Sequence, residues 1–188
     1  LVRLEKSQFK ALLARSAQVS MALTRQIIQR LKTEHQPARF AAPVTIGLMP
    51  VTDGVDLRRF ADSLALQLRK TARVRVVDSV AVDAELGQPG AANGSGSDVE
   101  LNRRISLLLD EVESDHDFVL LISDSTPTPW THRCSRHCDE LLLLADATQP
   151  PRVHAIEDEC LVRRPPRTEA AEILLLLHGA DVKCPQGT

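Results

Sequence analysis

The sequence predicts an α/β fold: a doubly wound, mostly parallel sheet of about five strands with flanking helices, preceded by an α-helical segment. Short apolar or β-branched runs occur at 44–49, 73–77, 118–122, 141–144 and 173–177, and runs without polar alternation are typical of strands buried on both faces. Helical patterns separate most of these runs, and such strand-helix-strand units are joined by right-handed crossovers. A chain of 188 residues with 43% hydrophobic and 26% charged residues is large enough for one or two soluble domains.

The balance of charge and the scarcity of aromatic residues argue against nucleic acid as a partner. The chain has 23 Lys and Arg residues against 25 Asp and Glu, and its net charge of -2 supplies no attraction to polyanions. Tyr is absent and only one Trp and four Phe occur, so platforms on which bases stack are hard to assemble.

The cysteines and the absence of targeting signals indicate the compartment. Cys134, Cys138, Cys160 and Cys184 are too sparse for a disulfide scaffold, which indicates a reducing environment. No signal peptide and no apolar run of about 18 residues occurs, so we expect a cytoplasmic location. Because the chain begins with Leu1 rather than Met, we expect it to be a piece of a longer protein.

The first part of the chain has a helical rhythm. One apolar stripe is formed by residues at every fourth position, Val19, Leu23, Ile27 and Leu31. We expect this stripe to pack on a neighbouring domain; a membrane-surface helix and a homodimer formed through the stripe are the alternatives. Residues 34–43 are polar, contain two prolines and predict a linker.

Two long helices are predicted from a capping residue followed by an apolar face. Asp56 is the expected N-cap of the first, and Ser97 with Glu100 is the expected capping box of the second. The two apolar faces are Leu57, Phe60, Ala61, Leu64 and Leu68, and Leu101, Ile105, Leu108, Leu109 and Val112. The Gly, Asn and Ser residues in 91–97 predict a mobile loop, too small and polar to be buried.

A third, short helix is predicted before the fourth strand. Thr128 would be its N-cap and Pro129 its first residue, and the helix would continue through Cys138.

In an open parallel sheet the functional crevice lies beyond the carboxyl ends of the strands, so the loop after Met49 is the first candidate site. A phosphate cradle there needs closely spaced glycines, a Lys, and a Ser or Thr for magnesium. Residues 50–56 hold one glycine between Asp53 and Asp56 and no Lys, so they should repel phosphate. Nucleotide hydrolysis is therefore not expected, and a degenerate relative of P-loop NTPases stays an alternative.

Asp124 follows the third strand, where many nucleotide-binding sheets place a carboxylate that directs magnesium. Together with Asp53 and Lys183 it could resemble the acidic cluster of a receiver domain. The spacing departs from that arrangement, because Pro50 and Val51 follow the first strand and Lys183 lies well past the fifth. Caps and turns are the simpler interpretation of these carboxylates, and a small-molecule or phosphate-sensing domain remains an alternative.

A second cluster has the residue types of a metal site: His132, Cys134, His137 and Cys138. It lacks the paired Cys-x-x-Cys knuckles of structural zinc sites, and Arg133 and Arg136 add positive charge. We therefore expect ordinary helix residues, with Cys138 packed inside as a small apolar group. No nucleophile elbow occurs, and no catalytic, cofactor-binding or metal-binding residue is predicted.

The segment 123–134, Ser-Asp-Ser-Thr-Pro-Thr-Pro-Trp-Thr-His-Arg-Cys, resembles a stretch of the neuropathy target esterase family of patatin-like phospholipases. In that family a strand similar to 118–122 precedes the motif, and a run similar to 138–144 follows it. Residues 1–33 are similar to the last strand and closing helices of a cyclic-nucleotide-binding-like domain. The resemblance implies that 34–43 is a linker and that 44–188 is a degenerate, Rossmann-like nucleotide-binding-like domain upstream of the catalytic domain.

The family resemblance implies a modular serine esterase that acts on phospholipids or lysophospholipids, with association of the longer protein with membranes as an option. Its catalytic Ser-Asp dyad would follow Thr188, so no catalytic residue is carried over. The positions that match the motif are carried over as a signature loop that could dock another domain: Asp124, Ser125, Thr126, Thr128, Pro129, Trp130, Thr131, Arg133 and Cys134.

Our first hypothesis is accordingly a non-catalytic coupling domain whose partners are the catalytic and nucleotide-binding-like domains of the same longer chain. In this hypothesis Trp130 is a docking anchor, since a large aromatic side chain offers much area to bury at an interface. The alternative for Trp130 is that it plugs the end of the sheet.

Overall fold

The computed structural model describes residues 42–150, 152–162 and 170–179, which belong to one compact unit, Ala42–Thr188. The predicted helices of 1–33, the stripe from Val19 to Leu31 and Lys183 lie outside the described residues. No helix in the described part of the chain combines the length and the apolar character that crossing a bilayer requires.

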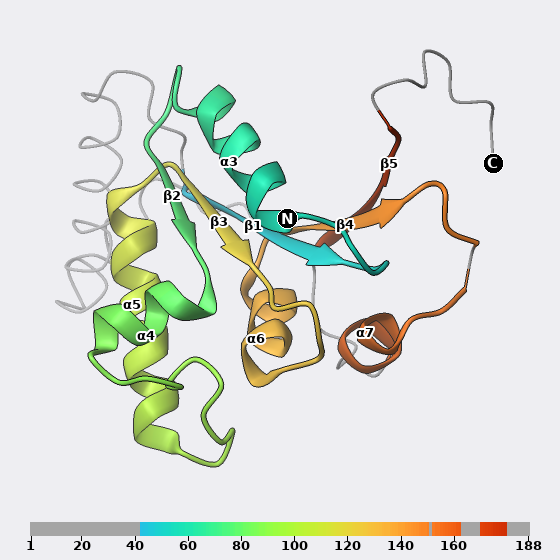
Figure 1. Cartoon of the computed structure of the whole chain (residues 1–188). Helices are drawn as coiled ribbons and strands as arrows, with labels where there is room; N and C mark the ends of the chain where they lie inside the picture. The colour runs from blue at the N-terminus through green and yellow to red at the C-terminus, as the bar shows by residue number, and fades with distance from the viewer. Residues whose placement is uncertain (1–41, 151, 163–169, 180–188) are drawn as a thin grey trace, which may run out of the picture. The chain divides into compact units, whose positions relative to one another are not determined.

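A five-stranded parallel sheet is the centre of the domain (Figure 1). Its strands are β1 (Val44–Pro50), β2 (Val74–Val77), β3 (Phe118–Ile122), β4 (Glu140–Asp146) and β5 (Ala171–Leu177). Their order is β2-β3-β1-β4-β5, and each neighbouring pair is parallel. The α/β fold and the five predicted strands are therefore confirmed.

Helices cover both faces of the sheet, as a doubly wound fold requires (Figure 1). They are α3 (Leu57–Leu68), α4 (Ser79–Leu86), α5 (Val99–Asp115), α6 (Pro129–His137) and α7 (Ala155–Glu157), which continues into a π-helical turn, η1 (Asp158–Val162). The α3 helix packs on one face, and α5 and α6 pack on the other. The cores on the two faces are mostly aliphatic, and Trp130 is the largest of their fully buried side chains.

Two of the predicted helix starts are confirmed by their capping bonds. The Asp56 carboxylate accepts a hydrogen bond of 3.0 Å from the Arg59 amide at the start of α3. The Thr128 hydroxyl caps α6, whose first residue is Pro129. Both caps are local, because the side chain and the amide it binds lie within three residues, which explains why the sequence alone predicts them.

The region between β2 and β3 differs from the prediction in three respects. Asp98, rather than Ser97, caps α5, and its carboxylate accepts a 2.9 Å bond from the Leu101 amide. The 91–97 loop is not wholly exposed, because Ala91 and Ala92 are buried under α5. The α4 helix was not predicted, since its five apolar residues among eight follow no amphipathic period.

The last strand also departs from the prediction of strands buried on both faces. β5 pairs with β4 alone and is an edge strand of the described sheet. Its side chains at Ile173, Leu174 and Leu176 are exposed. An apolar run therefore predicted the strand correctly but not its burial.

Gly47 gives a test of how tightly β1 packs against β4 and against Cys138, the residue that follows α6. A Cβ atom at this position would lie 2.8 Å from Leu141 Cδ1 and 3.0 Å from Cys138 Sγ. The Gly47→Val variant should lower the free energy of unfolding by about 1–3 kcal/mol, because the added methyl groups overpack the contact. Urea unfolding followed by circular dichroism measures the change. Gly96→Ala is the control and should shift stability by less than about 0.5 kcal/mol, since a Cβ there meets nothing within 4 Å.

Candidate functional site

The crevice at the carboxyl ends of β1 and β3 is the topological switch point of the sheet. These strands are neighbours, but the chain leaves β1 through α3 toward β2 and leaves β3 through α6 toward β4. Ligands of open α/β sheets bind at such points. Here the loop after β1 and the signature loop after β3 line a cavity of about 370 Å³, together with residues 152–156.

The loop after β1 is tied down by its own side chains and does not form a phosphate cradle. The Asp56 carboxylate already accepts the Arg59 amide at the start of α3. The Val51 amide donates to the Leu144 carbonyl at 2.8 Å, and the Thr52 hydroxyl accepts the Asp146 amide at 2.8 Å. These bonds hold the loop against β4, so it does not arch over an anion.

The Asp124 carboxylate is the hub of the signature loop. It accepts hydrogen bonds from Ser79 Oγ at 2.7 Å, Asn93 Nδ2 at 3.0 Å and Thr128 Oγ1 at 2.7 Å. These donors come from the first turn of α4, the 91–97 loop and the N-cap of α6. With three donors within 3.0 Å, the carboxylate oxygens of Asp124 are engaged in hydrogen bonds inside the domain. The interpretation of Asp124 as a structural carboxylate therefore fits this arrangement better than magnesium binding.

The threonines of the motif continue this network. Thr128 Oγ1 donates to Asp124 and accepts the Thr131 amide at 3.2 Å, while Thr131 Oγ1 donates to the Thr126 carbonyl at 2.8 Å. Thr131 is buried, whereas Ser125, Thr126 and Pro129 are exposed. The motif thus has an inward side that makes hydrogen bonds and an outward side that is open to a partner.

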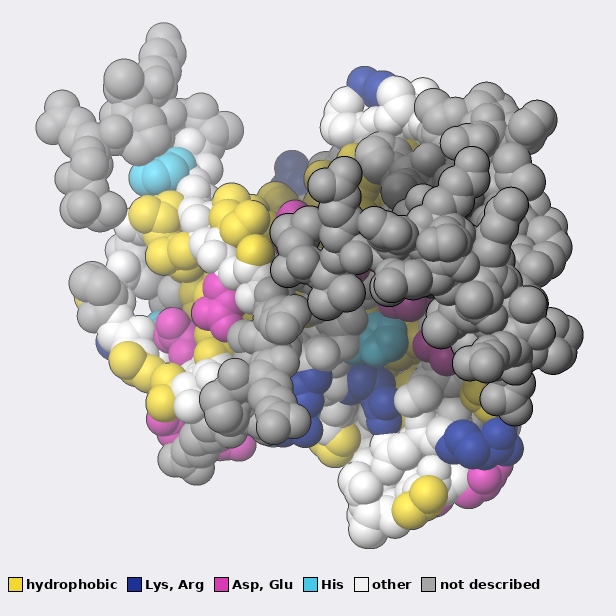
Figure 2. Space-filling model, turned by 180° about the vertical axis from the view of Figure 1, so that it is seen from behind, with side chains coloured by type: hydrophobic (Ala, Val, Ile, Leu, Met, Phe, Trp, Pro, Cys, Tyr) yellow, Lys and Arg dark blue, Asp and Glu magenta, His cyan; other side chains and the backbone are white. Residues whose placement is uncertain are grey.

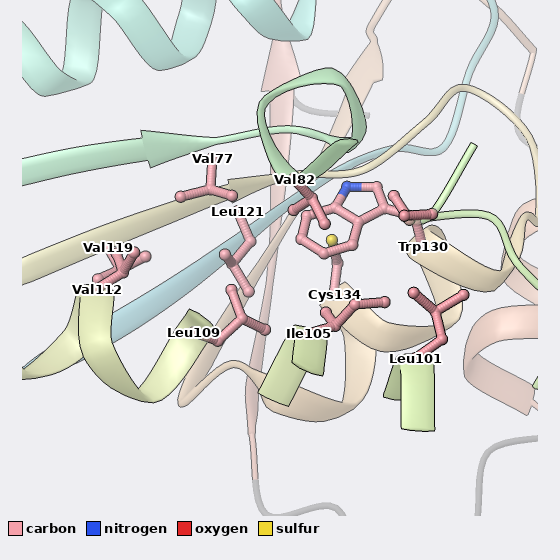
Figure 3. Close-up of a cluster of buried hydrophobic side chains, with 12 residues drawn as sticks. Val77, Val82, Leu101, Ile105, Leu109, Val112, Val119, Leu121, Trp130 and Cys134 are labelled. Carbon is pink, nitrogen blue, oxygen red and sulfur yellow. The ribbon is translucent and has the colours of Figure 1, made fainter. Parts of the chain in front are cut away.

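Trp130 is fully buried in the core, which corrects the hypothesis of a surface docking anchor. Its exposed fraction is 0%, and the indole lies among Val82, Ile105 and Cys134 (Figure 3). Its Nε1 donates to the Ile122 carbonyl at 2.8 Å at the end of β3. The side chain therefore plugs the end of the sheet, and docking would have to use the exposed residues of the loop.

The residues of the receiver hypothesis have separate partners. The Asp53 side chain is exposed and lies 3.9 Å from the Arg152 guanidinium. Asp124 is bonded to its three neutral donors. Lys183 lies outside the described residues.

The cluster of His and Cys residues is dispersed by the fold. Cys134 packs in the core around Trp130, and Cys138 packs with Met49 and Leu141, so Cys138 is buried as predicted. Burial raises the pKa of the Cys134 thiol well above its usual value, which keeps it protonated. Within the described ranges no group of His, Cys, Asp and Glu side chains could hold a metal ion.

His137 has a different partner, the carboxylate of Glu113 on α5. His137 Nε2 lies 2.9 Å from Glu113 Oε1, which also accepts the Thr45 hydroxyl at 2.6 Å. The bond from His137, more than that from Thr45, lowers the pKa of Glu113. Glu113 thereby links α5 and α6 to the first residues of β1.

The comparison with known families settles the relationship that the motif suggested. A sequence model described as the Neuropathy Target Esterase family P-loop like domain matches residues 43–188. The chain belongs to the neuropathy target esterase family. Within that family it represents the P-loop-like domain, whose α/β sheet carries the signature loop described above.

Curated relatives agree with this assignment. The chain is 31% identical over 144 residues to patatin-like phospholipase domain-containing protein 7 of Rattus norvegicus, covering 77% of this chain and 10% of that protein. It is 31% identical over 147 residues to lysophospholipase nte1 of Emericella nidulans, covering 76% of this chain and 9% of that protein. The chain thus spans about a tenth of the length of these relatives.

Among solved structures, the kinase domain of VpsO matches with a TM-score of 0.49 and 15% sequence identity. The match covers 86% of this chain and 100% of that one.

Two partners of the signature loop in this P-loop-like domain could not be found by sequence reasoning. Ser79 and Asn93 lie 45 and 31 residues before Asp124, which both of them bind. Asn93 also accepts the Trp130 amide at 3.1 Å through Oδ1. Asp78 is the N-cap of α4 and is a local signal for that helix. No local signal exists for the contacts of Ser79 and Asn93 with Asp124, because only the folded sheet brings these segments together.

Replacing the buried indole should destabilise the domain strongly. Trp130→Ala should lower the free energy of unfolding by about 3–5 kcal/mol, because it leaves a large cavity and removes the donor to Ile122. Urea unfolding followed by far-ultraviolet circular dichroism measures the loss without relying on Trp fluorescence. Leu66→Ala on α3 is the control, since Leu66 is 63% exposed. An unchanged unfolding midpoint for Trp130→Ala would contradict the role of a plug.

Removing the Asp124 carboxylate should also be costly. Asp124→Ala leaves three donors without their acceptor, and we expect a loss of about 2–4 kcal/mol in the free energy of unfolding. Asp110→Ala is the matched control on the exposed face of α5 and should be close to neutral. Hydrogen exchange should show faster exchange at Ala92 and Trp130 amides in Asp124→Ala than in Asp110→Ala. Equal exchange in the two variants would show that Asp124 does not organise these segments.

Proposed function

We propose that this P-loop-like domain is a non-catalytic coupling domain of a longer patatin-like serine esterase that acts on phospholipids or lysophospholipids. Three kinds of evidence support the proposal. The family and its relatives, a patatin-like phospholipase domain-containing protein and a lysophospholipase, supply the esterase context. At the end of the loop after β1, Asp56 caps the Arg59 amide of α3, and the Asp124 carboxylate accepts the Thr128 hydroxyl within the fold. The exposed edge of the sheet supplies a surface for a partner.

The observation that carries the proposal is the exposed apolar surface of β5. Ile173, Leu174 and Leu176 are 41%, 58% and 41% exposed, and they point to both faces of the strand by the alternation of side chains. In the rear view of Figure 2, hydrophobic side chains gather on the left, the side on which β5 lies in that view. Natural edge strands are normally short, charged or covered, because an exposed apolar edge promotes aggregation.

The occupant that we propose for this edge is another domain of the same polypeptide. The curated relatives are about ten times longer than the matching stretch, so most of such a protein would lie outside this chain. Covering three aliphatic side chains would contribute several kcal/mol at about 25 cal/mol per Å² of apolar surface. A contact of that size would let the domain hold a catalytic domain in a fixed position.

The N-terminal part belongs to the same proposal. Residues 1–33 would complete a cyclic-nucleotide-binding-like domain, and 34–43 would link it to the coupling domain. The coupling domain would then stand between a regulatory domain and a catalytic one.

Hydrogen exchange in the longer protein tests the proposed contact. Backbone amides of β5 should be protected in the longer protein and less protected in the 188-residue chain, because the partner covers the edge only there. Leu174→Lys with Leu176→Lys should abolish the extra protection and lower esterase activity at least threefold. These substitutions point exposed side chains to solvent and should leave the folding of the 188-residue chain unchanged.

Leu66→Lys on α3 is the control, because it makes the same Leu-to-Lys change at an exposed leucine on a different element. Its activity and exchange should match those of the unaltered protein. Equal protection of β5 in the short and the long protein, or full activity of the double variant, would refute the coupling proposal.

A further inference from the structure

A second cleft lies between α5, α6 and the 91–97 loop, on the face of the sheet opposite α3. Its volume is about 600 Å³, within the range of cavities that bind small organic molecules. One wall is apolar and includes Ala91, Leu101 and Ile105. The other wall is basic and consists of His132, Arg133, Arg136 and His137 from α6.

Arg133 is the central cation of this cleft. Its guanidinium donates to Asn102 Oδ1, and it has no carboxylate partner among the residues that the structure describes. Partial burial of the guanidinium lowers the pKa of Arg133. A guanidinium has five N–H donors, so most of them remain available to a ligand.

Asn102 holds this cation in place from α5. Its Nδ2 group donates to the carbonyls of Gly96 at 2.9 Å and Asp98 at 2.8 Å, while its Oδ1 accepts Arg133. The side-chain amide of Asn102 therefore orients both the Arg133 guanidinium and the 91–97 loop. A cation that is positioned before the ligand arrives loses less entropy on binding.

His132 adds a second, independent observation. Its Nδ1 atom is buried and has no hydrogen-bond partner in the described structure. Buried polar atoms are almost always paired, so an orphaned one next to a cavity indicates a group that the described residues do not supply. Arg136, exposed on the same wall, likewise forms no ion pair within the described part of the chain.

We propose that this cleft binds a phosphate ester, with the phosphate on Arg133 and Arg136 and the organic group against Leu101 and Ile105. Arginine forks match the oxygens of a phosphate, and the residues that line the cleft include no carboxylate to repel one. The signature motif then has two uses, because Asp124 and Trp130 build the core and Arg133 faces the ligand.

Calorimetry with the 188-residue chain tests this assignment, using phenyl phosphate and glycerol 3-phosphate as probes and benzyl alcohol as the uncharged match. We expect a phosphate ester to bind with a dissociation constant of about 1 mM or tighter and the alcohol not to bind. Arg133→Gln should weaken binding at least tenfold and Arg136→Gln at least threefold. Arg69→Gln, at the end of α3 on the other face, is the control and should bind as the unaltered chain does.

Gly96→Glu is a second variant that does not depend on the half-buried arginine. A Cβ at Gly96 meets nothing within 4 Å and needs no left-handed backbone, so the chain should fold and present a carboxylate at the cleft. This variant should lose binding at least tenfold. Binding that is equal in Gly96→Glu and Arg69→Gln, or no saturable binding of either probe, would overturn the proposal.

Vesicles of phosphatidylcholine with phosphatidic acid separate the two sources of a phosphate ester. Cosedimentation that is lost in Arg133→Gln and Gly96→Glu would support the cleft and assign the ester to a lipid headgroup. Soluble binding without cosedimentation would support the cleft and assign a free phosphate ester. Cosedimentation that Gly96→Glu does not change, without soluble binding, would overturn the proposal in favour of surface attraction.

Discussion

The Asp124 carboxylate is the contact on which the arrangement of the site depends. It receives hydrogen bonds from α4, from the 91–97 loop and from the N-cap of α6, three segments that share no local sequence signal. Asn93 links Asp124 to Trp130, because its side-chain amide donates to the Asp124 carboxylate and accepts the Trp130 backbone amide. The buried indole then closes the end of the sheet through its bond to Ile122. One acidic side chain thus sets the positions of the core tryptophan and of the helix that carries Arg133.

At the switch point of this P-loop-like sheet, side chains that follow β1 and β3 support the fold. The position after β3 is occupied by a carboxylate whose oxygens are engaged by neutral donors. The position after β1 is occupied by a loop whose Asp56 carboxylate accepts the Arg59 amide of α3 and whose Val51 amide donates to Leu144 of β4. Both groups that would face a nucleotide phosphate therefore stabilise the fold itself. Among the described residues, the side chains that remain open to a ligand or partner lie elsewhere. They are the basic residues of the cleft beside α6 and the exposed apolar residues of β5.

Sequence reasoning succeeded where the signal was local. The strands follow from apolar runs, and the caps at Asp56 and Thr128 follow from side chains that bind amides three residues away. It failed where neighbours in space decide the outcome. Ser97 and Asp98 are equally good capping residues on paper, and the packing of the 91–97 loop under α5 selects Asp98. The apolar run of β5 predicts a strand, but only the order of the sheet places that strand at an edge.

The family, the α/β class and the signature motif follow from the sequence without the structure, because each depends on residue order and on short-range periodicity. The tertiary structure decided what the motif does. Trp130 could have been an anchor on the surface or a plug in the core, and its environment of Val82, Ile105 and Cys134 made it a plug. Arg133 could have been one more helical surface charge, and its burial beside Asn102 without an acidic partner in the described structure made it a candidate ligand contact. Burial and pairing depend on which distant segments meet, and a linear pattern carries no information about those meetings.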